Sequence, residues 1–155
     1  MEGGIVQRGK RARGALKGRA VESGALAEVQ SLLDGAQRKT GVDPRRRDLL
    51  IENLHLIQDR FGHIPAAHLV ALAREMQLAM TEVYEVATFY HHFDVIKEGE
   101  KAPPALTVRV CDSLSCELSG SNELIKGLKQ SLGDQVRVIP APCVGRCEQA
   151  PVAVV

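Results

Sequence analysis

Tryptophan is absent from the 155-residue sequence, and three phenylalanines and two tyrosines supply all of its aromatic rings. Large aromatic side chains contribute much of the apolar contact in a core, so their few positions are informative. Four of the five lie within ten positions, between residues 84 and 93. We therefore expect the helix that carries these four rings to anchor the core of its part of the chain.

Long apolar runs are also missing. A bilayer-spanning helix needs about 20 mostly apolar residues, and no run in this sequence approaches that length. The N-terminus lacks the apolar segment that marks a secretory signal peptide. We expect no membrane span and a cytoplasmic location, where cysteines are free or bound to metal and structural disulfides are not expected.

The familiar motifs of catalysis do not occur. There is no phosphate-binding loop, no GxGxxG fingerprint and no serine–histidine triad. The histidines have no metal-ligand partners at matching spacings, and they are His55, His63, His68, His91 and His92. We therefore predict no catalytic residue in this chain.

Acidic residues are scarce in the first 20 positions, where Glu2 is the single acid. The basic residues of this stretch are Arg8, Lys10, Arg11, Arg13, Lys17 and Arg19. Residues 1–20 also contain several glycines and show no apolar period, so we predict that they form a disordered basic arm. The whole chain has a net charge of only +1 and the arm has no aromatic residue to stack on bases, so we expect no nucleic-acid binding. A solvated tail or a docking segment for an acidic partner subunit fits better.

What the sequence does contain is four cysteines in two close pairs. Four residues separate Cys111 from Cys116, and three separate Cys143 from Cys147. Four thiolates are the ligand set of a structural zinc ion or of an iron–sulfur cluster. Zinc knuckles most often have two residues between paired ligands, so these wider loops suit a broader cofactor. A zinc-stabilised interaction domain without a redox role stays open as an alternative, whereas a dithiol enzyme is disfavoured because no Cys-x-x-Cys pair occurs.

The segments around the cysteines predict one β-α-β unit. A strand-like run at 107–110 leads into the first pair, and a second run at 136–139 leads through two prolines into the second pair. Between them, residues 121–132 have leucines at four-residue steps and Gly133 as a helix stop. Such crossovers place their strands in parallel, so we expect both cysteine loops at one edge of a small sheet.

Upstream of residue 97 the apolar pattern predicts four amphipathic helices, hence a bundle. The first predicted helix covers Gly24–Leu33 and is ended by Gly35, and the second is started by Asp43 and Pro44 and closed by Gly62. The third is opened by Pro65 and runs to Leu78, and the fourth is capped by Thr81 and runs to Phe93. The charged and proline-containing stretch 97–105 reads as a linker. The predicted class is α+β, with a bundle at 21–96 and a cysteine domain at 106–155.

Four motifs then combine in one chain: the two cysteine pairs, Gly62-His63-Ile64-Pro65, the run from Glu82 to Tyr90, and the tail Ala150-Pro151-Val152. Together they resemble the 24-kDa (E-subunit) family of NADH dehydrogenases. The resemblance implies a helical N-terminal part, a thioredoxin-like domain, and one 2Fe-2S cluster held by Cys111, Cys116, Cys143 and Cys147. It also implies that FMN and NAD bind to a partner subunit or to a downstream fused domain.

Residues 46–59 and 94–100 resemble the version of this family that is fused to, or partners, the flavin subunit of NAD-dependent formate dehydrogenases. The implied function is electron transfer within an NAD(H)-linked oxidoreductase, without catalysis by this chain alone. Because relatives continue past the Ala-Pro-Val tail with another strand and a final helix, we expect the sequence to be a fragment or the first part of a longer polypeptide. Arg109 and Arg146 lie beside the cysteine pairs, either as charges that raise the cluster potential or as ordinary solvated charges.

Overall fold

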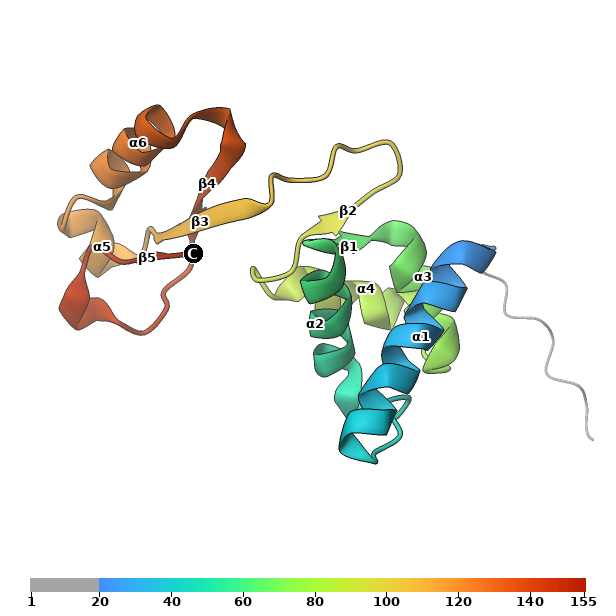
Figure 1. Ribbon diagram of the computed structural model, residues 1–155. Coiled ribbons are helices and arrows are strands. Elements are labelled where there is room, and N and C mark those ends of the chain that lie inside the picture. Colours follow the sequence, from blue (N-terminus) through green and yellow to red (C-terminus); the bar gives the residue numbers. More distant parts are fainter. Residues whose placement is uncertain (1–19) are drawn as a thin grey trace, which may run out of the picture.

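The computed structural model describes residues 20–155. The predicted basic arm therefore lies, except for its last residue, outside the described residues. The described part combines helices with two small sheets, which confirms the α+β class (Figure 1). None of the described helices combines the length and the apolar composition that a bilayer span requires.

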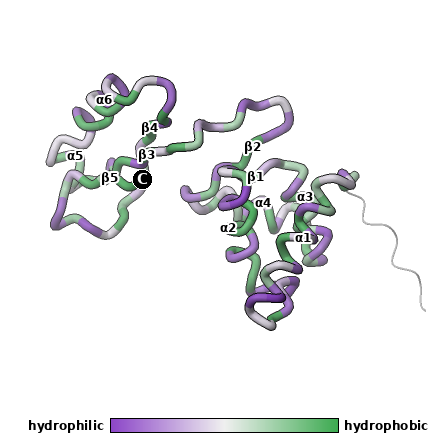
Figure 2. The backbone as a smooth tube through the Cα atoms, in the orientation of Figure 1, coloured by the Kyte–Doolittle hydropathy of each residue, from purple (hydrophilic) through white to green (hydrophobic). Residues whose placement is uncertain are grey.

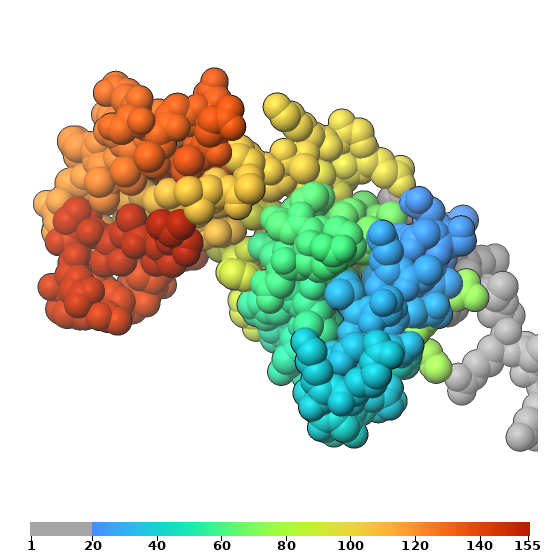
Figure 3. Space-filling model, in the orientation of Figure 1, coloured from blue at the N-terminus to red at the C-terminus, as the bar shows by residue number. Residues whose placement is uncertain are grey.

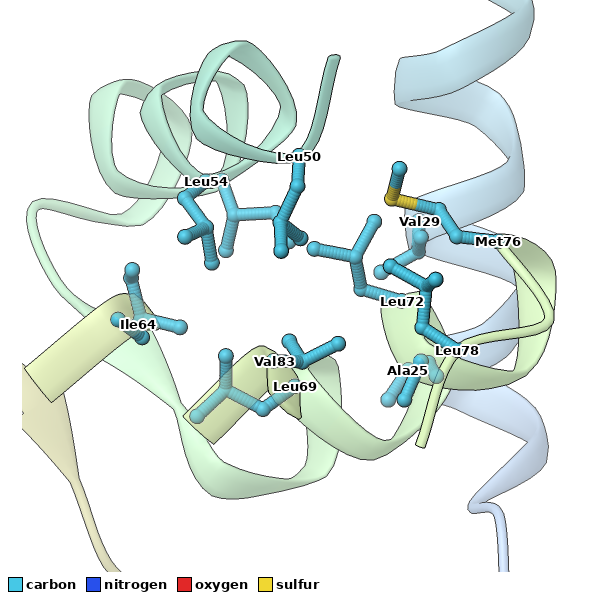
Figure 4. Packing of buried hydrophobic residues seen from close by; sticks show 14 of the residues in the cluster. Ala25, Val29, Leu50, Leu54, Ile64, Leu69, Leu72, Met76, Leu78 and Val83 are labelled. Carbon is cyan, nitrogen blue, oxygen red and sulfur yellow. The ribbon is translucent and has the colours of Figure 1, made fainter. Parts of the chain in front are cut away.

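We call the first part of the chain, residues 23–96, the helical unit. Its elements are α1 (Ser23–Thr40), the 3-10 turn η1 (Arg47–Leu49), α2 (Leu50–Phe61), β1 (Ile64–Pro65), α3 (Ala66–Glu75), α4 (Met80–Phe89) and β2 (Val95–Ile96). Strands β1 and β2 pair in parallel through Ile64 and Val95. One apolar cluster fills the space between the four helices, with side chains such as Leu54, Leu69 and Val83 fully buried (Figure 4). Burial of these faces holds the bundle together, since short isolated helices are marginal in water.

Several predicted helix boundaries are wrong, beginning with the end of the first helix and the start of the second. Gly35 does not end α1, which continues to Thr40 and stops at Gly41 in the left-handed conformation, φ 71°. A glycine inside a helix costs only about 1 kcal/mol relative to alanine, and the good helix formers around Gly35 outweigh that. Asp43 and Pro44 do not open α2 either, because Asp43 Oδ1 accepts a hydrogen bond from the Arg45 backbone N–H (3.0 Å) and so forms a local turn.

The later boundaries match better. Gly62 closes α2 as predicted, with φ 73° and its N–H donating to the Gln58 carbonyl. Pro65 occupies the N-cap position of α3, although the helix ends at Glu75 and not at Leu78. Thr81 does not cap α4, since Ala79 holds that position and makes no side-chain cap bond.

The aromatic residues do not anchor the core as expected. Phe93 is buried at 7% exposure, but Phe89 is 79% exposed and Tyr90 is 41% exposed. Helix α4 ends at Phe89, so the helical period that would have turned Tyr90 inward does not reach it. The core is instead made mainly of aliphatic side chains (Figure 4).

We call residues 106–155 the cysteine unit. It contains β3 (Leu106–Cys111), α5 (Leu114–Leu118), α6 (Ser121–Leu132), the 3-10 turn η2 (Gly133–Gln135), β4 (Val136–Ala141), the 3-10 turn η3 (Cys147–Gln149) and β5 (Ala153–Val154). Strands β3 and β4 are parallel, and β5 pairs antiparallel with the other edge of β3. The predicted β-α-β unit and the bounds of its helix are thus confirmed.

Helix α6 covers one face of this sheet. Val108, Val110 and Val138 are buried there and pack against Leu124 and Leu128 of the helix. This small cluster shares no residue with the core of the helical unit. Figure 1 shows the two units as two lobes joined by the extended segment between β2 and β3, which Figure 2 shows to be mostly hydrophilic, and Figure 3 shows that the lobes touch. The predicted domain division, with 97–105 as a linker between independently folding parts, stays a prediction.

Candidate metal centre

The first two thiols lie at the end of β3 and in the short helix that follows it. Cys111 is the last residue of β3, and Cys116 lies inside α5. Both are buried, at 2% exposure each. Cys111 lies two residues after Arg109 on β3, so alternation places its side chain on the side of the sheet opposite Val108 and Val110.

The second two thiols lie in the loop after β4, and both are exposed to solvent. The Sγ atoms of Cys143 and Cys147 are 3.7 Å apart. Gly145, with φ 76°, turns the loop between them so that its backbone N–H donates to Cys143 Sγ at 3.4 Å. A positive φ is easily adopted only by glycine, so this residue is what allows the loop to fold back on itself.

Strand register brings the two loops together. Cys111 lies opposite Ala141 in the parallel β3–β4 ladder. The Asp112 N–H donates to the Ala141 carbonyl at 3.0 Å, and the Cys111 N–H donates to the Val152 carbonyl at 2.9 Å. Both cysteine loops therefore leave the sheet at the same edge, as the β-α-β pattern predicts.

Electrostatic influences also cross from one loop to the other. A hydrogen bond with the Ser113 backbone lowers the pKa of Cys111, and the backbone of Val144 in the second loop adds to this effect. Hydrogen bonding with the Cys143 thiol raises the pKa of Cys147, against a smaller lowering by the Ser115 side chain of the first loop. The two loops are thus close enough to affect each other's thiols.

Cys116 differs from Cys111 in its proton affinity. A hydrogen bond with the Val152 backbone lowers the pKa of Cys116, but burial and the adjacent Cys111 thiol outweigh it, so that the pKa is raised. Backbone N–H groups and a low thiol pKa favour the thiolate, which is the form that binds metal. This arrangement makes Cys111 the readier thiolate of the first pair.

The thiols come together as two pairs. Two sulfurs bonded to one tetrahedral metal at about 2.3 Å lie about 3.8 Å apart, and the Cys143–Cys147 separation of 3.7 Å matches that value. Among the described residues, no three Cys, His, Asp or Glu side chains converge on a position for a single ion. The donor set, four thiols in two pairs, fits a cofactor with two metal atoms.

A model of the thioredoxin-like 2Fe-2S ferredoxin family matches residues 36–155 of this sequence. The chain belongs to this ferredoxin family. Its relatives include the E subunit of the NADH-quinone oxidoreductase of Aquifex aeolicus, which is 35% identical over 72% of this chain and 72% of that protein. The E 2 subunit of the NADH-quinone oxidoreductase of Rhizobium meliloti is 31% identical over 70% of this chain and 67% of that protein.

Another relative is the HndA subunit of the NADP-reducing hydrogenase of Solidesulfovibrio fructosivorans, 28% identical over 72% of this chain and 68% of that protein. Membership of the ferredoxin family confirms the thioredoxin-like fold and the 2Fe-2S cofactor, and the relatives confirm the resemblance to the 24-kDa family. The chain is therefore similar to subunits of oxidoreductases.

The two arginines expected near the cluster of this ferredoxin-family chain are engaged in ion pairs. Arg146 Nε lies 3.0 Å from Glu148 Oε1, and Arg109 Nη2 lies 3.1 Å from Asp94 Oδ2. Each charge is thereby partly neutralised, so neither is a free positive neighbour of the thiols. The sequence analysis missed Gly145, although its position between two cysteines and its lack of a side chain were a usable signal.

The helical unit offers a groove of about 480 Å³ between α2 and α4. Ile51, Val86 and Phe89 contribute apolar surface, and Arg47 and Glu82 at its rim are paired with each other at 2.6 Å. Its other polar groups are the carboxylates of Asp48 and Glu85 and the hydroxyl of Tyr90. No serine, cysteine or histidine lines it, so it lacks a nucleophile–histidine pair.

Proposed function

We propose that this chain is the electron-transfer subunit or domain of an NAD(H)-linked oxidoreductase, in which Cys111, Cys116, Cys143 and Cys147 hold one 2Fe-2S cluster. The observation that supports this ligand set most directly is the grouping of the thiols as two pairs at one sheet edge, with the Cys143 and Cys147 sulfurs 3.7 Å apart. A single zinc ion would need all four sulfurs around one centre. When bound, the cluster supplies one-electron transfer.

The chain's own residues hold and shield this site unequally. Cys111 and Cys116 are buried against the sheet, whereas Cys143 and Cys147 lie on the solvent side. The Gly145 N–H already donates to one sulfur, and such hydrogen bonds stabilise negative charge on a thiolate. The exposed 143–147 loop is therefore the side from which an electron-transfer partner approaches in our proposal.

The partner we propose is a flavin-bearing, NAD-binding subunit or fused domain. The relatives named above are subunits of an NADH-quinone oxidoreductase and of an NADP-reducing hydrogenase. This chain carries no nucleotide-binding fingerprint of its own. Among possible parent enzymes we favour an NAD-dependent formate dehydrogenase, on the resemblance of residues 46–59 and 94–100, and we keep the cytoplasmic location expected from the sequence.

Spectroscopy and metal analysis test the cofactor. The purified chain should absorb in the visible, contain about two irons per chain, and give a paramagnetic signal after one-electron reduction. A colourless protein with one zinc per chain would favour the zinc-stabilised interaction domain and reject the proposal.

Reconstitution tests the partner. NADH should reduce the cluster only when a flavin-bearing subunit is added, and formate dehydrogenase flavin subunits should work better than those of NADH-quinone oxidoreductases. NADH turnover by the pure chain without flavin would contradict the division of labour that we propose. Equal reduction by both kinds of flavin subunit would remove the formate dehydrogenase assignment alone.

A further inference from the structure

Asp94 is fixed in the helical unit through its backbone. Its N–H donates to Gln58 Oε1 at 2.9 Å, and its carbonyl accepts from the Ile64 N–H at 2.8 Å. Gln58 is itself buried, and its Nε2 donates to the His92 carbonyl at 2.7 Å. Phe93, next to Asp94, belongs to the apolar core. The backbone of residue 94 therefore has little freedom to move relative to α2 and β1.

The carboxylate of Asp94 binds two cations of the cysteine unit. Its Oδ2 atom accepts hydrogen bonds from Nη2 of Arg109, at 3.1 Å, and from Nη2 of Arg137. Arg109 belongs to β3 and Arg137 to β4, so one carboxylate ties both parallel strands of the cysteine unit. Nη2 of Arg109 also donates to the His92 carbonyl at 3.2 Å.

The two arginines share one face of the sheet. Arg137 lies opposite Thr107 in the ladder, and its Nε donates to Thr107 Oγ1 at 3.0 Å. Thr107 and Arg109 are two residues apart on β3, so their side chains point to the same side. Helix α6 covers the other side through the valines of both strands. The polar face of the sheet is thus the face that meets the helical unit.

Apolar packing does not hold the two units in their relative position. The two buried clusters are separate, and among the described residues no helix of one unit packs extensively against the sheet or helices of the other. The connecting segment 97–105 has no regular structure. By contrast, the side chains of Asp94, Arg109 and Arg137 are only 15%, 19% and 25% exposed. Partly buried, charge-assisted bonds of this kind are stronger and more directional than surface ion pairs.

We propose that Asp94 is a positioning residue that sets the orientation of the cysteine unit on the helical unit, by binding Arg109 and Arg137 from two neighbouring strands. Arg109 lies two residues before Cys111 on the same strand, so fixing it fixes the base of the first cysteine loop. The helical unit and the exposed Cys143–Cys147 loop are then presented to a partner as one rigid surface. The inference concerns the orientation of the two units and stands without the proposed function.

Residual dipolar couplings of the backbone amides test this on the full, cluster-loaded chain. In the wild-type protein, amides of α1–α3 and of α6 should fit one shared alignment tensor. Asp94→Asn removes the charge and leaves two guanidinium groups without their carboxylate, so the two units should then require different tensors. Asp59→Asn is the matched control, because it removes the same charge from an exposed position on α2 and should keep one tensor.

The proposal would be overturned if the two units of the wild-type protein required different alignment tensors. It would also be overturned if the two units of Asp94→Asn still fitted one shared tensor. Arg137→Lys provides a second test should Asp94→Asn fold poorly, because lysine keeps the positive charge but loses the planar fork that binds the carboxylate and Thr107 together. Arg137→Lys should therefore also give different tensors for the two units. Asp94→Glu keeps the carboxylate, so its two units should fit one shared tensor. A shared tensor in Arg137→Lys would equally count against the proposal.

A functional measurement follows if the chain is an electron-transfer subunit as proposed. In the complex with its flavin-bearing partner, Asp94→Asn should slow cluster reduction by NADH relative to Asp59→Asn. Failure of the wild-type complex to reduce the cluster would reject the proposed function and leave the dipolar-coupling result untouched. An unchanged rate in a variant that has lost the shared tensor would show that the orientation has no role in electron transfer.

Discussion

The Sγ atoms of Cys143 and Cys147 are 3.7 Å apart, the separation of two sulfurs that share one tetrahedral metal. Three residues form the loop that achieves this, and Gly145 at its centre donates its N–H back to the first sulfur. The pair is thus preorganised by the backbone. Cys111 and Cys116 reach the same edge of the sheet from the neighbouring strand.

Replacing any one of the four cysteines by serine should remove or strongly destabilise the cluster. A hydroxyl oxygen is a harder and weaker ligand for iron than a thiolate. The visible absorption and the paramagnetic signal of the reduced protein provide the measurement. Ser131→Ala, at an exposed position of α6 away from the thiols, is the control. A cysteine variant with the wild-type spectrum would show that its residue is not a ligand.

Gly145→Ala should weaken cluster binding without affecting the fold of the helical unit. At φ 76° an alanine costs about 1–2 kcal/mol, which favours loop conformations that separate Cys143 from Cys147. Faster loss of visible absorbance in the presence of a chelator measures this effect. Gly127→Ala is the matched control, since Gly127 lies within α6 with no atom near its missing Cβ and alanine there should stabilise the helix by about 0.5–1 kcal/mol. Identical cluster lifetimes in Gly145→Ala and the wild-type protein would refute the role of this glycine.

The cysteine unit could be predicted because its signals are local and agree with one another. Alternating valines mark β3 and β4, leucines at four-residue steps mark α6, and Gly133 ends it. A β-α-β crossover has one favoured hand, so the convergence of the two cysteine loops followed without further information.

Boundaries in the helical unit were harder because single residues have competing roles. Gly35 is a usual helix terminator, but in the middle of α1 its cost is outweighed by the packing of Val29 and Leu33. Asp43 has the side chain of an N-cap, but its hydrogen bond with the Arg45 N–H closes a local turn, and α2 begins only at Leu50. Local propensity alone does not decide between such outcomes.

The contact between Asp94 and the two arginines could not have been predicted from the sequence. Asp94 is 15 residues from Arg109 and 43 from Arg137 along the chain. No periodicity links them, and charged residues on a strand are more often solvated. Their pairing depends on how the two units pack, which only the three-dimensional structure shows.

Phe93→Ala should destabilise the helical unit by about 3–5 kcal/mol, because a buried phenylalanine leaves a cavity when truncated. Phe89→Ala, four residues earlier, should change the free energy of unfolding by less than about 0.5 kcal/mol. The exposed fractions, 7% for Phe93 and 79% for Phe89, are the reason for the difference. Urea denaturation followed by the helical circular dichroism signal measures both. Equal losses in the two variants would mean that Phe89 is packed in solution.

The last prediction concerns the pH dependence of stability and rests on His92. Burial lowers the pKa of His92 below its usual value, and the nearby positive charges of His55 and Arg109 lower it further, against opposing effects of Asp59 and Asp94. In the unfolded chain the imidazole has its ordinary pKa of about 6.5. As the pH falls through that value, the unfolded chain binds a proton that the folded chain does not, so the free energy of unfolding decreases.

The contribution of His92 to the free energy of unfolding should therefore be fully present above about pH 6.5. It should be lost progressively as the pH falls from there to the lower pKa of His92 in the folded state. Urea denaturation at about pH 7.5 and about pH 5.5, on either side of the unfolded-state value, gives the change in unfolding free energy. His92→Gln should show a smaller decrease between these two pH values than the wild-type protein, because glutamine has no proton to bind. Its backbone carbonyl, which accepts from Gln58 and Arg109, is retained in the variant. His91→Gln, the same substitution at the neighbouring position, is the control for the loss of an imidazole. A decrease in His92→Gln as large as that of the wild-type protein would mean that other groups account for the acid sensitivity.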